Sequence, residues 1–218
     1  MPHASAEAVA TLYQEYLAGS VETVADDLAR YAALLERWQR VQNLVSRETL
    51  RELWTRHISD SLQLLPLLNP GEREFLDLGS GGGLPALPLA IARRGDASSR
   101  FVLVEPNGRK ASFLRTVARE LGLNVVVLDR RAEQIDSRET MPQVITSRAL
   151  APMPVLCGLA APFFTTANRA LFHKGREHVE EIAETRAHWD FDVLIIPSRI
   201  GGDGVLLDVR RLRAKSTG

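Results

Sequence analysis

The sequence predicts an α/β protein in which a mostly parallel, seven-stranded sheet follows a helical extension. In the first 70 residues, apolar side chains recur every three or four positions, which is the helical period. From residue 71 onward, short apolar runs alternate with helical patterns. A strand, helix, strand succession implies right-handed crossovers between parallel neighbours. We therefore expect an N-terminal helical extension, residues 1–70, and an α/β core, residues 71–218.

Two amphipathic segments form the predicted extension. From Val21 to Val45 the apolar residues fall on one helical stripe, and Leu50 to Leu65 repeats the pattern. Pro66 and the turn Asn69-Pro70-Gly71 close the segment. We expect these helices to pack and not to bind a cofactor.

Seven short apolar runs after Gly71 are the strand candidates of the core. Helical patterns follow the first five, whereas only Gly201-Gly202-Asp203-Gly204 separates the last two, which predicts an antiparallel C-terminal hairpin at one edge. The predicted strands are Glu74–Leu78, Phe101–Glu105, Val125–Leu128, Gln143–Thr146, Arg169–Phe172, Val193–Ile196 and Val205–Val209. The clearest predicted helices are Leu84–Arg93, Asn107–Leu121 and Gly175–Trp189.

The composition is that of an ordinary globular protein with one sizeable core. The 218 residues are 45% hydrophobic and 25% charged. Because no apolar run reaches the ~18 residues of a membrane span and residues 1–20 do not resemble a signal peptide, we expect a cytoplasmic protein without a membrane partner. Cys157 is the single cysteine, which excludes an internal disulfide and a cysteine-based zinc cage.

The glycine-rich loop after the first core strand is the expected ligand site. In an open α/β sheet, ligands bind beyond the carboxyl ends of the strands, where the strand order reverses. A phosphate-cradling loop would continue with Gly-Lys-Ser/Thr, whereas Gly83 is followed by Leu84 and Pro85, so a triphosphate is disfavoured. Leu84 would also crowd the pyrophosphate of a dinucleotide. A dinucleotide therefore stays open, and the alternative is an adenosine ligand without phosphates, namely S-adenosylmethionine.

Glu105 ends the second predicted strand, where a carboxylate can accept hydrogen bonds from both ribose hydroxyls. It supports an adenosine-containing ligand and leaves open whether that ligand is a dinucleotide or S-adenosylmethionine. A glycine turn that binds nothing is the third interpretation of this region.

Several stretches in series resemble those of a known family. They are WQRVQNLVS at 38–46, RHISDS at 56–61, DLGSGGGLP at 77–85, Glu105 with RKASFL at 109–114, RAE at 131–133, SRA at 147–149 and Lys174-Gly175. From about residue 30 to about residue 180, the chain resembles the bacterial 16S rRNA guanine-N7 methyltransferase family, also called the glucose-inhibited division protein B family.

The resemblance implies a Rossmann-like class I methyltransferase that moves a methyl group from S-adenosylmethionine to guanine N7 in 16S rRNA. Glu105 would bind the ribose, Ala132 with Glu133 the adenine, and Gly79 with Leu84 the methionine and ribose end. The cofactor-binding residues that carry over by position are Gly79, Gly81, Leu84, Glu105, Ala132, Glu133 and Arg148. We expect a monomer that acts on 16S rRNA, within a partly assembled small ribosomal subunit.

The chemistry of guanine N7 fits the residues at the end of the fourth strand. N7 carries a lone pair and no proton, so its methylation needs no general base. Arg148 is the predicted catalytic residue, because it can donate to guanine O6 and leave N7 open. An ion pair with an acid such as Asp77 is the alternative role. We expect His57 and Asp60, three residues apart, to anchor the extension to the core, and Asn43 to cap a helix end.

Other chemistries lack their residues. Pyrimidine C5 methylation needs an activated thiolate, and Cys157 has no cation beside it in sequence. The five histidines show no metal-ligand spacing, so no metal is expected. A nicotinamide-dependent oxidoreductase would need a catalytic tyrosine in the core. A methyltransferase for another RNA or a small molecule, that oxidoreductase, and a non-enzymatic scaffold are the alternative functions.

The charge balance leaves the RNA contact unlocated. With 27 basic and 27 acidic residues, a local patch must meet any nucleic acid. Trp38, Trp54 and Phe172 are candidates to stack the target base and are also candidates for the core. The basic clusters are Arg109, Lys110, Arg115 and Arg119, then Arg130 and Arg131, then Arg210, Arg211, Arg213 and Lys215.

Overall fold

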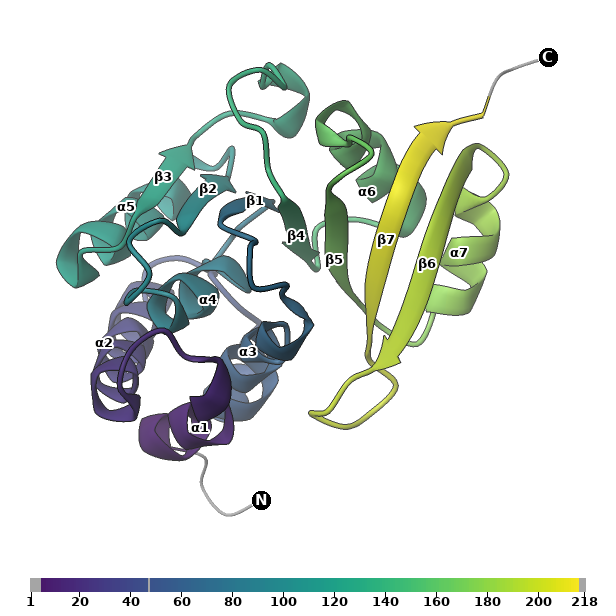
Figure 1. Cartoon of the computed structure of the whole chain (residues 1–218). Coiled ribbons are helices and arrows are strands. Elements are labelled where there is room, and N and C mark those ends of the chain that lie inside the picture. The colour runs from purple at the N-terminus through teal and green to yellow at the C-terminus, as the bar shows by residue number, and fades with distance from the viewer. Residues whose placement is uncertain (1–4, 47, 216–218) are drawn as a thin grey trace.

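A single seven-stranded sheet runs through the protein (Figure 1), whose computed structural model describes residues 5–46 and 48–215. Its strand order is β3-β2-β1-β4-β5-β7-β6. The first five strands are parallel, and β7 pairs antiparallel with both β5 and β6. The strands are β1 Glu74–Leu78, β2 Arg100–Val104, β3 Val125–Leu128, β4 Val144–Arg148, β5 Arg169–Lys174, β6 Trp189–Pro197 and β7 Val205–Ala214. The order reverses between β1 and β4, which confirms the predicted α/β class and its antiparallel C-terminal hairpin.

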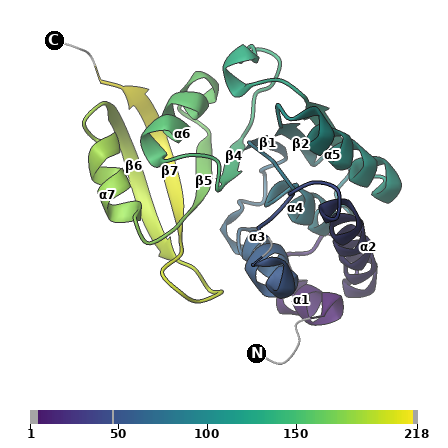
Figure 2. The same cartoon turned by 180° about the vertical axis from the view of Figure 1, so that it is seen from behind.

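The helices fall into two groups that cover opposite faces of the sheet. Figures 1 and 2 show α1 to α4 gathered together, with α6 and α7 beside the hairpin strands. The α-helices are α1 Ala6–Leu12, α2 Val21–Gln39, α3 Asp60–Leu62, α4 Ala86–Ala92, α5 Gly108–Leu121, α6 Met153–Ala160 and α7 His178–Thr185. A π-helical segment, η3 Leu53–Ser59, leads directly into α3. The short 3₁₀ turns are η1 Gln14–Tyr16, η2 Leu50–Glu52, η4 Leu65–Leu67, η5 Ala132–Gln134 and η6 Ala161–Phe163.

Alternation along the strands divides the interior into two hydrophobic clusters. On β1, Phe75 packs into the cluster of the extension, α4 and α5, whereas Leu76 and Leu78 pack into the cluster of α6 and α7. Every residue of α4 is buried, because α4 lies between the sheet and the extension. The extension therefore covers a helix that would otherwise expose an apolar face to water.

Two predicted helical elements differ from the structure. Only the 3₁₀ turn η5 follows β3, so the predicted helical pattern is wrong there, and Val126 of β3 is left 38% exposed. Helix α2 ends at Gln39 and not near Val45. The side-chain carbonyl of Gln39 accepts from the backbone N–H groups of Leu44 and Val45 at 2.8 and 3.0 Å, which holds the chain in a loop.

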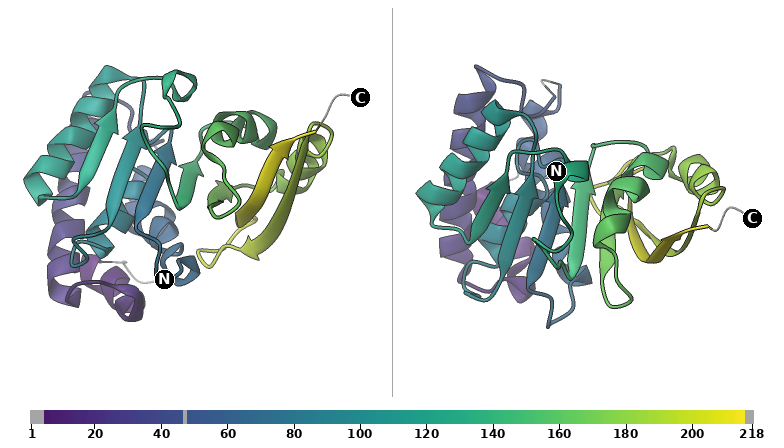
Figure 3. Two further views of the ribbon diagram at one scale, coloured as in Figure 1. Left: turned by 45° about the horizontal axis from the view of Figure 1, so that its top comes forward. Right: turned by 90° about the horizontal axis from the view of Figure 1, so that it is seen from above.

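The hairpin is longer than the sequence pattern indicated. Strand β6 already begins at Trp189, where a helix was predicted to end. Trp189, Phe191 and Val193 pack on one cluster, and Asp190 and Asp192 alternate with them. This alternation has the strand period of two, which overrides the helical interpretation. Figure 3 shows the hairpin at the edge of the sheet away from α1 and α2.

Candidate active site

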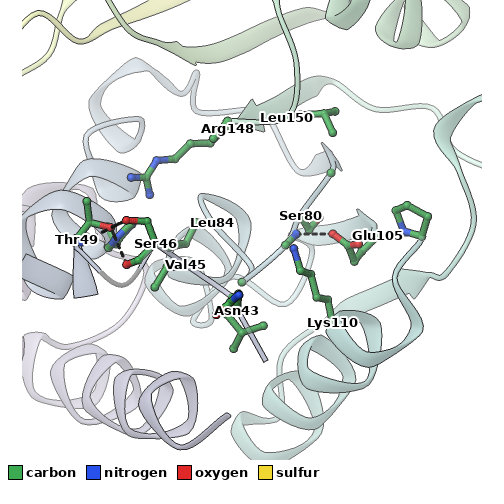
Figure 4. Close-up of a pocket in the computed structure, with 17 residues that line it drawn as sticks. Asn43, Val45, Ser46, Thr49, Ser80, Leu84, Glu105, Lys110, Arg148 and Leu150 are labelled. Carbon is green, nitrogen blue, oxygen red and sulfur yellow. Dashed lines mark hydrogen bonds between the residues drawn. The ribbon is translucent and has the colours of Figure 1, made fainter. Parts of the chain in front are cut away.

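A cavity of about 790 Å³ opens at the carboxyl ends of β1, β2 and β4, where the strand order reverses (Figure 4). Figure 4 shows Arg148 and Thr49 on one side of the cavity and Glu105 and Lys110 on the other. The lining comes from the extension, the glycine loop, and the ends of β2 and β4. It consists of Asn43, Leu44, Val45, Ser46, Thr49, His57, Gly79, Ser80, Gly81, Gly82, Leu84, Glu105, Pro106, Lys110, Arg148, Ala149 and Leu150.

The glycine loop between β1 and α4 bends tightly around the end of β2. The N–H groups of Gly79 and Ser80 both donate to the carbonyl of Val104, at 2.9 and 3.0 Å. Gly79 has φ +69°, and a Cβ at this position would collide with the side chain of Leu150. The backbone conformation thus favours glycine at residue 79, and a larger residue would also require the side chain of Leu150 to move.

The carboxylate of Glu105 fixes the other side of the loop. One oxygen accepts from the Gly81 N–H at 2.8 Å, and the other accepts from the Asn107 N–H at 2.9 Å. Each carboxylate oxygen has a second lone pair that these bonds do not use. Glu105 can therefore hold the loop and still accept two hydroxyl groups of a ligand.

The extension builds one wall of the cavity through the loop after α2. Tyr31, buried in α2, donates its hydroxyl to the carbonyl of Gly82 at 2.7 Å, so the extension also holds the glycine loop from below. Burial raises the pKa of Tyr31, which keeps the hydroxyl protonated as a donor. Asn43 lines the cavity and does not cap α2, contrary to the prediction, since α2 has ended at Gln39.

Arg148 reaches the cavity from the end of β4 and is held by the extension. Its Nε lies 3.2 Å from a carboxylate oxygen of Asp60, and its Nη2 donates to the carbonyl of Arg56 at 2.6 Å. The alternative role of Arg148, an ion pair at the strand end, is therefore confirmed, although the acid is Asp60 and not Asp77. Ala149, with φ +53°, turns the chain immediately after it. Arg148 is thus held by two of its nitrogen atoms before any ligand arrives.

His57 and Asp60 divide the anchoring role that was predicted for the pair. Asp60 binds Arg148, and its backbone carbonyl lies 2.9 Å from Nε2 of His173 on β5, so Asp60 joins the extension to the core. His57 contacts Thr49 within the extension, at 2.8 Å between Nε2 and Oγ1. Burial and nearby arginines lower the pKa of His57 to about 4, so its ring is neutral at pH 7.

Asp77 lies buried beneath the loop at the end of β1. Thr146 donates its hydroxyl to Oδ1 at 2.7 Å, whereas Oδ2 has no partner among the described residues. Burial raises the pKa of this carboxyl to about 7. An acid that remains partly protonated near neutral pH therefore lies under the candidate site.

Known proteins resemble this chain over most of its length. The model of a family described as rRNA small subunit methyltransferase G matches residues 24–200. The chain belongs to this family. It is 42% identical over 189 residues to the ribosomal RNA small subunit methyltransferase G of Cereibacter sphaeroides strain ATCC 17029, which covers 86% of this chain and 91% of that protein. The protein of the same name from Methylobacterium nodulans is 44% identical over 194 residues, 88% of this chain and 91% of its own.

Solved structures share the fold at low sequence identity. A Corynebacterium glutamicum protein superposes with a TM-score of 0.58 at 14% identity, covering 84% of this chain and 91% of its own. A mutant of MtNAS in complex with S-adenosylmethionine gives a TM-score of 0.55 at 18% identity, covering 94% of this chain and 77% of its own. These likenesses concern the fold alone, and they agree with the α/β class predicted from the sequence.

The cavity brings together most of the residues that the sequence proposed. Gly79, Gly81, Leu84, Glu105 and Arg148 all line it. Ala132 and Glu133, proposed for the adenine, lie in the turn η5 after β3 and not in the lining. The lining also contains residues that were not predicted as site residues, namely Val45, Ser46, Thr49, Lys110 and Leu150. Val45, Ser46 and Lys110 belong to the stretches 38–46 and 109–114 that carry the family resemblance.

Other candidates for chemistry lie elsewhere. Cys157 is fully buried in α6, and burial raises the pKa of its thiol to about 12, as expected for an inert cysteine. Phe172 is fully buried, and Trp38 and Trp54 pack against the core. Within residues 5–46 and 48–215, no group of three or more His, Cys, Asp or Glu side chains could hold a metal ion. No helix in the same ranges combines the length and apolar character of a membrane span.

Ion pairs within the described residues involve one arginine of the first basic cluster, one of the second and three of the C-terminal cluster. Arg115 pairs with Asp129 at 3.1 Å, and Arg130 pairs with Glu139 at 2.6 Å. Acids on β6 and β7 take up the cationic charge of the C-terminal cluster: Arg210 pairs with Asp208, Arg211 with Asp192 and Arg213 with Asp190.

Proposed function

We propose that the protein transfers the methyl group of S-adenosylmethionine to N7 of a guanine in 16S rRNA. The observation that carries this proposal is the pairing, in one open cavity, of the Glu105-held glycine loop with an arginine fixed at the end of β4. The first feature suits an adenosine ligand, and the second suits the O6 edge of a guanine. Membership of the family supports the same reaction.

The residues of the cavity fit the cofactor. Glu105 would accept the ribose hydroxyls with the lone pairs that its two backbone N–H bonds leave free. Gly79, Gly81 and Leu84 would line the methionine and ribose end. We assign the adenine to Ala132 and Glu133, which follow β3 at the same edge of the sheet. S-adenosylmethionine supplies an electrophilic sulfonium methyl group when it is bound.

The protein's own task is to position and polarise. Guanine N7 attacks with its lone pair and loses no proton, so the lining needs no general base. Arg148 would donate to O6, and its ion pair with Asp60 offsets the guanidinium charge beside a ring that becomes cationic on methylation. The rate then comes from holding N7 and the methyl group in line and close together.

The substrate that we propose is a partly assembled small ribosomal subunit, met in the cytoplasm by a monomer. The chain has no net charge, and acids pair with many of its arginines, so it is poorly suited to hold naked RNA tightly. An assembled subunit would present the target guanine in a fixed loop and supply contacts beyond the RNA backbone.

Transfer of labelled methyl from S-adenosylmethionine to small subunits that lack this modification tests the proposal. The subunits are digested to nucleosides after the reaction and analysed by mass spectrometry. We expect the label in 7-methylguanosine, and more of it from subunits than from deproteinised 16S rRNA. Label in another nucleoside would refute the assigned atom. An absence of label, despite cofactor binding in calorimetry, would refute the substrate.

A further inference from the structure

A second cavity, of about 460 Å³, lies next to the candidate active site. The two cavities share Arg148 and Ala149, so the end of β4 forms the wall between them. The second cavity lies where the extension, the end of β5 and the β6–β7 loop meet. The residues that line it only here are Arg56, Asp60, Gln63, His173, Lys174, Gly175, Arg176, Ser198, Ile200, Gly201, Gly202, Asp203, Gly204 and Val205.

A polar network builds this cavity from segments that are far apart in sequence. Gln63 donates its side-chain N–H to a carboxylate oxygen of Asp60 at 2.5 Å and to the hydroxyl of Ser198 at 3.3 Å. Its side-chain carbonyl accepts from the Arg199 N–H at 3.0 Å. The extension, the hairpin loop and, through Asp60, Arg148 are thereby held in one arrangement.

The charges of this cavity favour an anion. Arg56 is exposed and only distantly paired, 3.8 Å from Glu52. Arg176 is exposed, and no ion pair holds it within the described residues. Arg148 already neutralises Asp60, and Lys174 is occupied by Glu181 at 2.5 Å. Two available guanidinium groups therefore flank the cavity, against one exposed acid, Asp203.

The backbone is also accessible on this side. Gly175 does not have a positive φ, and a Cβ at this position would meet nothing within 4 Å. Neither conformation nor packing within the chain thus calls for glycine at residue 175. A bare backbone beside two arginines allows a phosphate group to approach N–H donors closely.

We propose that the second cavity binds the RNA phosphodiester backbone next to the target guanosine, with Arg56 and Arg176 contacting its phosphates. This inference rests on the proposed function, since a guanine facing Arg148 in the first cavity places its flanking phosphates on the far side of that wall. A target base leaves its stack to reach a methylation site, and cations must hold the backbone that remains. The C-terminal basic cluster is less suited, because acids on the hairpin pair with its arginines.

The Arg56→Gln and Arg176→Gln variants test this assignment, with Arg119→Gln as the matched control. Arg119 is an exposed arginine near the C-terminal end of α5, the end remote from the cavities. KM for unmodified small subunits is measured at several salt concentrations. We expect each cavity variant to raise KM severalfold and to lower the slope of log KM against log salt by about 0.7–0.9. Its kcat and its S-adenosylmethionine affinity should equal those of Arg119→Gln.

Two outcomes would overturn the assignment while the wild-type protein is active. The first is a KM and a salt slope for both cavity variants equal to those of Arg119→Gln. The second is that the cavity variants differ from Arg119→Gln only in how strongly inorganic phosphate inhibits methyl transfer. The cavity would then be a site for a free anion and not for the RNA backbone. A wild-type protein that transfers no methyl to subunits would refute the proposed function itself and is seen before any variant is compared.

Discussion

Two buried acids at neighbouring strand ends use their oxygens differently. Each carboxylate oxygen of Glu105 accepts one backbone N–H, from Gly81 or from Asn107. Asp77 has the hydroxyl of Thr146 on one oxygen and no partner on the other within the described residues. Glu105 is thus held in place with lone pairs free to accept from a ligand, whereas Asp77 carries an uncompensated cost of burial.

Glu105→Gln should weaken S-adenosylmethionine binding. The amide would place N–H donors against the N–H of Gly81 or Asn107, and it could accept at only one position. We expect a Kd roughly 10- to 100-fold higher, since a hydrogen bond to a charged group contributes about 1.5–3 kcal/mol. Calorimetry measures it. Glu74→Gln, at the opposite end of β1, is the control and should bind normally. An unchanged Kd in Glu105→Gln would contradict the ribose assignment.

Asp77→Asn should change how stability depends on pH. Burial raises the pKa of this carboxyl in the folded state to about 7, above its ordinary value of 3.8, so between these pH values the folded state keeps a proton that the unfolded chain has lost. This carboxyl therefore makes the free energy of unfolding fall as pH rises through that window. We expect the free energy of unfolding of the variant, relative to that of the wild type, to be about 1–3 kcal/mol higher at about pH 8.5 than at about pH 5. Urea unfolding at both pH values measures this difference. An equal difference at both pH values would count against it.

Arg148→Lys should slow methyl transfer and leave the protein folded. A lysine keeps the charge but cannot contact both the Asp60 carboxylate and the Arg56 carbonyl while presenting a further donor to the base. We expect kcat to fall roughly 10- to 100-fold, as for a misplaced positioning group. Steady-state kinetics on small subunits measures it. Arg138→Lys, a 90% exposed arginine paired with Asp136, is the control. Wild-type kcat in Arg148→Lys would remove Arg148 from the reaction.

At this scale most of the site residues that the sequence proposed do line the cavity, but the sequence named few of their partners. The glycine loop, Glu105 and Arg148 follow from motifs. The packing of the extension determines that Asp60 pairs with Arg148 and that His57 contacts Thr49. Tyr31 is a further example. A tyrosine on a helical stripe is expected to be an ordinary core residue, and only the structure shows that its hydroxyl donates to the carbonyl of Gly82.

At the scale of elements, a buried ion network joins β5, β7 and the end of the extension. Arg169 of β5 contacts Glu72 at 2.8 and 2.9 Å and Asp208 of β7 at 2.8 Å, and it also donates to the carbonyl of Leu67. The side chains of Arg169 and Asp208 are each only 6% exposed. Removing one member would leave the others charged and buried.

Arg169→Met should therefore lower the free energy of unfolding by about 3–5 kcal/mol. Urea denaturation followed by circular dichroism measures this change. Arg213→Met on the same hairpin is the control, because Arg213 is 77% exposed and its pair with Asp190 should contribute less than about 1 kcal/mol. Equal losses in the two variants would show that the network does not stabilise the fold.

The pattern of apolar residues located the elements well where one face is buried. The parallel strands and α5 agree with their predicted positions within a few residues. The sequence predicts a helix where the turn η5 follows β3, because nothing in the composition shows that β3 is an edge strand. An edge strand needs less covering by helices than a central strand. The π-helical segment Leu53–Ser59 has the same apolar stripe as an α-helix, so the sequence does not distinguish the two helix types. The packing of the segment determines which type forms.

At the scale of the whole molecule, the extension is part of the core and not an appendage. One hydrophobic cluster contains Leu28, Tyr31 and Leu35 of α2 together with Leu87 of α4 and Phe113 of α5. We expect residues 71–218 alone to lack a cooperative thermal transition, because the buried faces of α4 and α5 would be exposed. Differential scanning calorimetry of that fragment beside the full chain tests this. A sharp transition in the fragment would establish two independent units.

The sequence by itself determined the α/β class, the glycine loop, its acid and the family, because these depend on local period and on residues that lie close together in the chain. Only the tertiary structure decided that the loop after α2 forms a wall of the cavity, that Asp60 orients Arg148, and that a second, basic cavity adjoins the first. These features join the extension, β4 and the hairpin loop, whose residues are separated by up to 136 positions. Contacts of that kind arise from the packing of whole elements, which a local pattern does not contain.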